Sequence, residues 1–140
     1  MELRDLGAGV TRESLAFYRE HRHEMGKLAR CTVRFPAFGD PYDPYLLVLA
    51  DHDGNRMLLS GCTTGYVGEG PNGTLEILVA EGVPVELALT VNDGARVCLS
   101  RTDGSWRIDD YAAAQARDPA DDLLQSLDPA VVEASHGRYR

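Results

Sequence analysis

The dipeptide Asp-Gly occurs three times in this chain, each time between two runs of strand-forming residues. Asp-Gly is a preferred sequence for the tight turn of a β-hairpin, because glycine adopts a positive φ without steric cost. The turns span residues 51–55, 92–94 and 102–105, and the paired runs are 45–50 with 57–60, 85–91 with 95–100, and 97–101 with 106–109. Hairpins join antiparallel neighbours, so the chain is predicted to form a mainly antiparallel sheet.

Helices are predicted before, between and after these strands. Apolar residues at helical spacing after Thr11, a suitable N-cap, predict a helix over residues 12–29, followed by a strand over 31–35. A short helix is expected over 74–80, and proline after aspartate predicts two more over 119–127 and 129–135. The predicted fold class is α+β, with an N-terminal helix, about six mainly antiparallel strands, one inserted short helix and short C-terminal helices.

Size and charge restrict the classes of protein to consider. A chain of 140 residues with 44% hydrophobic residues suits a single domain over residues 1–140. Its longest apolar run is too short for a membrane helix, and its net charge of -8 opposes direct binding to nucleic acid or to a membrane surface. Three widely spaced cysteines favour a reducing compartment, and we expect a cytoplasmic protein.

The segment 61–74 is rich in glycine and leads from a strand into the short helix. Glycines before a helix start can expose backbone amides that hold an anion such as a phosphate or carboxylate. The segment lacks the lysine of a phosphate-binding loop and the glycine spacing of a dinucleotide site, so tight packing is the competing explanation. The residues expected around an anionic ligand or nucleotide are Gly68, Gly70, Asn72, Gly73 and Thr74.

Catalytic and metal-binding patterns are weak. Cys62, with His52 from the preceding hairpin, is the best placed nucleophile, but nothing in the sequence brings the two together. Asp51, Asp53 and Asn55 alternate as calcium ligands do, yet the later positions of a calcium loop do not match. The sequence therefore assigns no catalytic residue, no metal ligand and no cofactor, and it favours a non-catalytic protein over an enzyme.

Loop tyrosines and clustered acids favour protein recognition. Tyr42, Tyr45 and Tyr66 lie in loops, where tyrosine gives contact area at low entropy cost, while Asp118, Asp121 and Asp122 lie in an acidic C-terminal region. The predicted function is that of a cytoplasmic interaction or accessory protein with an acidic surface, supporting or neutralising a basic partner. The alternative is a ligand-binding protein or small enzyme that uses the segment 61–74. The sequence leaves open whether the protein forms homo-oligomers.

Overall fold

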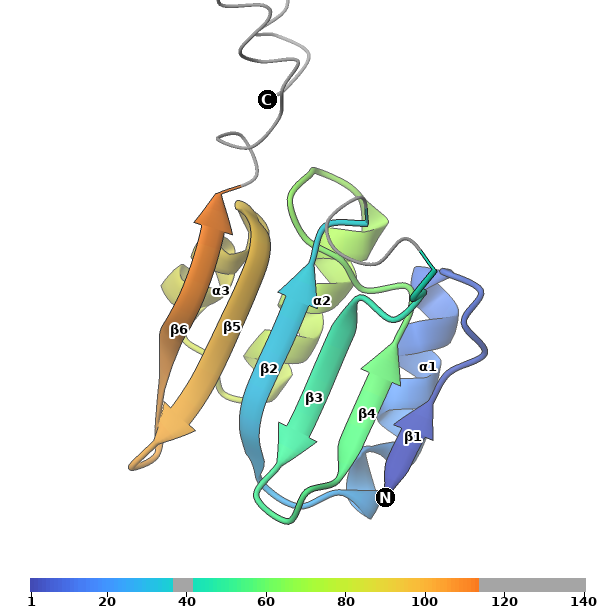
Figure 1. Ribbon diagram of the computed structural model, residues 1–140, viewed down its shortest axis with the longest axis horizontal. Helices are drawn as coiled ribbons and strands as arrows, with labels where there is room; N and C mark the ends of the chain where they lie inside the picture. Colours follow the sequence, from blue (N-terminus) through green and yellow to red (C-terminus); the bar gives the residue numbers. More distant parts are fainter. Residues whose placement is uncertain (37–41, 114–140) are drawn as a thin grey trace, which may run out of the picture.

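One six-stranded sheet runs through the part of the chain that the structure, a computed structural model, describes: residues 1–36 and 42–113. The strand order is β1-β4-β3-β2-β5-β6, with β1 parallel to β4 and every other pair antiparallel (Figure 1). The elements are β1 (Glu2–Arg4), α1 (Thr11–His21), a 3-10 turn (Arg22–Glu24), β2 (Leu28–Arg34), β3 (Leu47–Asp51), β4 (Arg56–Leu59), α2 (Glu69–Ala80), α3 (Val85–Asn92), β5 (Gly94–Thr102) and β6 (Ser105–Ala113).

The three α-helices all lie on one face of the sheet, so the described part of the molecule has two layers (Figure 1). Side chains alternate between the faces of each strand, and those on the helix side form the core. One row across the sheet places Met57, Leu49, Cys31 and Leu99 side by side, all almost fully buried. The helices complete the core on the same side of the sheet with four buried side chains, those of Ile77, Leu78, Ala88 and Val91.

Two of the three predicted hairpins are confirmed. In the turn between β5 and β6, Asp103 and Gly104 both have positive φ, and Thr102 pairs with Ser105 across a two-residue loop. In the turn between β3 and β4, the Asp51 carboxylate accepts hydrogen bonds from the amides of Asp53 and Asn55. Asp51 therefore organises a turn with its oxygens instead of presenting them to a cation.

The predicted hairpin around residues 92–94 is wrong. Residues 85–91 belong to α3, and Gly94 begins β5 directly after that helix. Residues 95–100, the predicted partner of 85–91, belong to β5, and both edges of β5 are occupied, by β2 and by β6, so residues 85–91 cannot pair with it. The spacing of Ala88 and Val91, both fully buried, suits a helix that packs on the sheet.

The predicted boundaries of two helices also change. The N-terminal helix ends at His21 instead of continuing to residue 29, because Met25 is extended and Leu28 already belongs to β2. The inserted helix begins at Glu69, five residues before the predicted start, so α2 includes two of the five glycines of the segment 61–74, Gly70 and Gly73. Proline at position 71 is accommodated because a first-turn residue needs no amide donor.

The number of strands agrees with the prediction, but one of the six strands is formed by different residues. Residues 2–4 form the short edge strand β1, which the sequence did not indicate, and the helix α3 replaces the strand expected at 85–91. The mixed content of six strands and three α-helices therefore holds for the described residues. The helices expected over residues 119–127 and 129–135 lie outside those residues.

Glu81 joins the helix layer to the sheet at the end of α2. Its carboxylate accepts two hydrogen bonds from the Arg22 guanidinium, at 2.7 and 3.0 Å, and a third from the Tyr18 hydroxyl. Trp106 of β6 donates its ring N–H to the Glu81 carbonyl at 3.3 Å. Burial and the hydrogen bond to Glu81 raise the pKa of Tyr18 above its ordinary value, so Tyr18 stays a neutral donor at physiological pH.

We expect replacement of Asp51 by asparagine to destabilise the fold in a pH-dependent way. Burial alone raises the pKa of Asp51, but hydrogen bonds from the Asn55 side chain and from the amides of Gly26, Asn55 and Asp53 outweigh burial and lower the pKa to about 2. A lowered pKa stabilises the folded state above the unfolded-state value of about 4, and this stabilisation is lost as the pH falls toward 2.

The free energy of unfolding should therefore decrease by about 2 kcal/mol at pH 7 in Asp51→Asn, with the difference shrinking between pH 4 and pH 2. Urea titrations at a series of pH values measure this. Asp53→Asn, which changes an exposed carboxylate of the same turn, is the control and should have little effect. A pH-independent loss in Asp51→Asn would contradict the assigned role of the charge.

Candidate functional site

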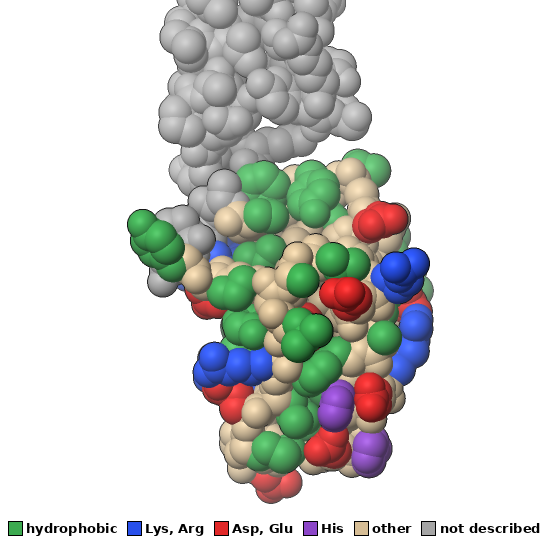
Figure 2. Space-filling view, turned by 90° about the vertical axis from the view of Figure 1, so that its right-hand side faces the viewer, with side chains coloured by type: hydrophobic (Ala, Val, Ile, Leu, Met, Phe, Trp, Pro, Cys, Tyr) green, Lys and Arg blue, Asp and Glu red, His purple; other side chains and the backbone are tan. Residues whose placement is uncertain are grey.

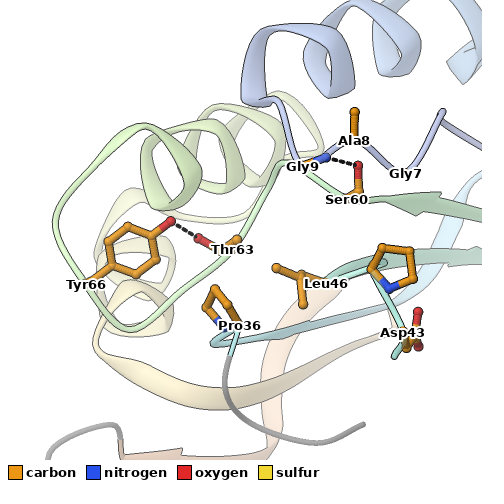
Figure 3. Close-up of a pocket in the computed structure, with 10 residues that line it drawn as sticks. Gly7, Ala8, Gly9, Pro36, Asp43, Leu46, Ser60, Thr63 and Tyr66 are labelled. Carbon is orange, nitrogen blue, oxygen red and sulfur yellow. Dashed lines mark hydrogen bonds between the residues drawn. The ribbon is translucent and has the colours of Figure 1, made fainter. Parts of the chain in front are cut away.

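A cleft of about 330 Å³ opens at the end of the sheet where β1, β2 and β4 finish (Figure 3). Three segments that are far apart in the sequence form its walls: the turn after β1, the chain on either side of residues 37–41, and the segment after β4. The lining residues are Gly7, Ala8, Gly9, Pro36, Asp43, Pro44, Leu46, Ser60, Thr63 and Tyr66. The cleft thus brings together the proline-containing loop and the glycine-rich segment, whose relative positions the sequence left open.

A buried carboxylate, that of Asp5, holds one wall of the cleft in place. It accepts hydrogen bonds from the Ser60 amide at 2.8 Å, the Ser60 hydroxyl at 2.8 Å, the Ser14 hydroxyl at 2.5 Å and the Gly7 amide at 2.9 Å. Ser60 in turn accepts from the Gly9 amide at 3.0 Å, a bond drawn in Figure 3. One side chain therefore connects the end of β1, the first turn of α1 and the end of β4.

The glycines of segment 61–74 allow close packing between backbone segments. A Cβ on Gly61 would lie 2.4 Å from the carbonyl carbon of Val10, and one on Gly73 would lie 2.6 Å from the Thr11 methyl group. A Cβ on Gly70 would lie 2.3 Å from the Thr63 hydroxyl oxygen. Close approach of α1 and α2 to the end of β4 is thus one physical requirement for glycine at these positions.

The residues predicted to hold an anion are not all accessible. Gly70, Gly73 and Thr74 are buried, and the Thr74 hydroxyl donates to the Thr63 carbonyl at 2.7 Å. Gly68 is the N-cap of α2, and Asn72 is exposed in the first turns of that helix. Anion binding by these residues stays a prediction.

The three tyrosines predicted for partner binding lie in different environments. Tyr66 lines the cleft, accepts a hydrogen bond from Thr63 at 2.9 Å and packs edge-on against Phe35, with its side chain 42% exposed. Tyr45 is half-buried and donates to the Asp5 carbonyl at 2.9 Å. Tyr42 is 92% exposed. Tyr66 therefore offers contact area in the cleft, Tyr42 is exposed directly before the lining residue Asp43, and Tyr45 supports the wall.

Large apolar side chains are exposed next to the cleft. Leu6 is 93% exposed and Val67 is 92% exposed, and each directly adjoins a lining residue, as Tyr42 does. Figure 2 views the molecule from the edge formed by β1 and α1 and shows hydrophobic side chains exposed between acidic and basic ones. Sequence analysis missed Leu6 and the turn around it, because a three-residue strand is too short to give a periodic pattern.

Among the described residues that line the cleft, none forms a recognisable catalytic arrangement, and Asp43 is the one with an ionisable carboxylate, amine, imidazole or thiol. Cys62 is fully buried, and burial, followed by the charges of Asp5 and Glu76, raises the pKa of its thiol to about 12. His52 precedes β4 and Cys62 follows it, so they lie at opposite ends of that strand. The described residues contain no group of three His, Cys, Asp or Glu side chains arranged to hold a metal ion.

Several expectations lie beyond what the structure describes. Asp118, Asp121 and Asp122 are outside the described residues, so their surface stays a prediction. Within residues 1–36 and 42–113, none of the helices has the length and apolar content needed to cross a membrane.

Comparisons of the chain with protein-family models, with curated proteins and with solved structures found no match.

We expect Asp5→Asn to weaken the cleft wall. The asparagine side chain has one acceptor oxygen instead of two, and its NH₂ group would face donors at Ser60 or Ser14. The free energy of unfolding should decrease by about 2 to 3 kcal/mol, as for loss of hydrogen bonds to a buried charge. Chemical denaturation measures this, with the exposed Asp93→Asn as control. Equal effects in the two variants would contradict the role of Asp5.

Thiol labelling should distinguish the three cysteines. Cys31 and Cys62 are buried, and burial raises the pKa of both thiols, whereas Cys98 is partly exposed. In the native protein Ellman's reagent should label Cys98 first and the other two only after unfolding. The fast reaction should disappear in Cys98→Ser. Fast labelling of Cys62 in the native state would show that its thiol is accessible and would make Cys62 a candidate nucleophile again.

Proposed function

We propose that this protein is a non-catalytic interaction protein that binds an apolar segment of a protein partner in the cleft at the end of the sheet. The observation that carries the proposal is that Leu6, Tyr42 and Val67 are all more than nine-tenths exposed and that each directly adjoins in sequence a residue that lines the same cleft. Apolar side chains that gather at a concave surface are typical of recognition sites, whereas scattered ones are ordinary surface residues.

The residues that line the cleft favour binding of a partner over catalysis. Most lining groups are glycine, alanine, proline, leucine and hydroxyl side chains, and the hydroxyls of Ser60 and Thr63 are engaged in internal hydrogen bonds. Such a surface can take apolar side chains and form a few neutral hydrogen bonds at its edge. Tyr66 supplies an aromatic ring that Phe35 and Thr63 already hold in place, so little side-chain entropy is lost on binding.

The net charge of the chain favours a basic partner. The net charge of -8 attracts basic proteins at long range and speeds their association. We therefore propose a partner segment that is apolar where it enters the cleft and basic around it, which agrees with an accessory or neutralising role in the cytoplasm.

The test starts from the full-length tagged protein isolated from its own host, with all bound proteins and small molecules identified by mass spectrometry. The double variant Leu6→Asp/Val67→Asp should retain the partner at least about tenfold less well, because charges would replace its apolar contacts. The matched control is Val85→Asp/Leu89→Asp, which changes two exposed apolar residues of α3, 54% and 50% exposed, away from the cleft lining.

The partner should remain bound to the control variant, and thermal unfolding should show that both variants are folded. Retention of the partner by the cleft variant would contradict the proposed function. A phosphorylated or carboxylated small molecule bound in place of any protein would overturn the proposal in favour of an anion site in segment 61–74.

A further inference from the structure

The face of the sheet opposite the helices is not covered by any described element (Figure 1). The pairing register identifies the side chains that project from this open face. One row across the sheet contains Arg56, Ala50, Arg30, Ser100 and Arg107, and the next contains Arg4, Leu58, Val48, Thr32 and Cys98. We call these rows, with the neighbouring Arg34 and Arg96, the open face.

The open face is rich in arginine although the chain as a whole is acidic. Six of the fourteen Lys and Arg residues of the chain project from it: Arg4, Arg30, Arg34, Arg56, Arg96 and Arg107. Glu2, Asp109 and Asp110 are the carboxylates on the same strand positions among the described residues, and Asp43, which precedes β3, pairs with the largely buried Arg34. A chain of net charge -8 therefore presents one flat surface of positive sign.

The middle of the open face is apolar. An antiparallel sheet with one wet face normally has polar side chains at its outward positions. Here the outward positions of β3 and β4 hold Val48, Ala50 and Leu58, with Arg30 on one side of Ala50 and Arg56 on the other. Leu58 is buried, and Val48 and Ala50 are half-buried. The surface thus combines an apolar strip with flanking guanidinium groups.

Four exposed arginines of the open face, Arg4, Arg30, Arg56 and Arg96, are available to exchange ion-pair partners. Arg4 and Arg56 share a single carboxylate, that of Glu2, and Arg96 pairs with Asp110. These pairs are half-exposed, and such surface pairs contribute little to stability. Arg30 forms no ion pair within the residues described. Exposed guanidinium groups that are weakly paired or form no ion pair can form bidentate hydrogen bonds with carboxylates of another molecule.

We propose that the open face is a second docking surface, which binds an acidic amphipathic segment of a protein partner. Carboxylates of that segment pair with Arg30, Arg56 and Arg96, and its apolar side chains cover the exposed parts of Val48 and Ala50. This surface is distinct from the cleft and has the opposite electrostatic preference. A nucleic acid fits less well, because the apolar strip offers nothing to a phosphate backbone and the total charge repels it.

The experiment uses the full-length protein and two labelled probes: a peptide of about 20 residues with leucine and glutamate repeating at helical spacing, and a single-stranded oligonucleotide of similar length. Fluorescence anisotropy over a salt series measures binding, and Ellman's reagent measures protection of Cys98. We expect the peptide to bind, to dissociate as salt rises and to slow the labelling of Cys98.

The variant Arg30→Glu/Arg96→Glu should weaken peptide binding at least about tenfold, since two attractive contacts become repulsive. Its matched control is Arg12→Glu/Arg19→Glu on α1, because Arg19 forms an exposed ion pair as Arg96 does, and both Arg12 and Arg30 are exposed. The cleft variant Leu6→Asp/Val67→Asp should bind the peptide normally, so failure of one proposal is separable from failure of the other.

Four results would overturn the inference: no peptide binding, equal weakening by both arginine pairs, no protection of Cys98, or tighter binding of the oligonucleotide. Peptide binding that appears only after Asp118, Asp121 and Asp122 are changed to lysine would also overturn it, because the chain's own acidic residues would then occupy the face. Thermal unfolding of each variant ensures that the folded protein is compared.

Discussion

The buried carboxylate of Asp5 connects three structural elements, which contain or adjoin residues 5, 14 and 60. Two of its bonds go to Ser60, one goes to Ser14 and one goes to Gly7, so the ends of β1 and β4 and the start of α1 share one acceptor group. A buried charge is tolerated only when its hydrogen-bonding capacity is filled. The cleft depends on this arrangement, because Gly7, Gly9 and Ser60 form one of its walls.

A second buried carboxylate, Glu81, fastens the other end of the helix layer through Tyr18 and Arg22. With α1, α2 and α3 all held on one side, no helix of the described residues covers the opposite face of the sheet. The two surfaces that we propose for partners follow from this layout. One is a neutral cleft where loops meet at the end of the sheet, and the other is a flat face where arginines surround an apolar strip.

The sequence indicated single residues near the cleft but not the cleft itself. Tyr66 of the glycine-rich segment lines it and Tyr42 directly precedes the lining residue Asp43, whereas the sequence left the relative positions of the two loops open. Leu6 and Asp5 were not predictable, because their importance comes from contacts with residues about fifty positions away. The arginines of the open face escaped notice for the same reason: Arg4, Arg30, Arg56 and Arg96 are scattered along the sequence and become neighbours only through strand pairing.

The sequence alone determined the turns at Asp51 and Asp103, because positive φ at glycine and hydrogen bonds from nearby amides depend on residues only a few positions apart. It also determined the mixed α and β character. Only the tertiary structure decided whether residues 85–91 became strand or helix, since their apolar, β-branched composition suits both. With β2 and β6 on the two edges of β5, these residues bury Ala88 and Val91 by packing on the sheet as α3.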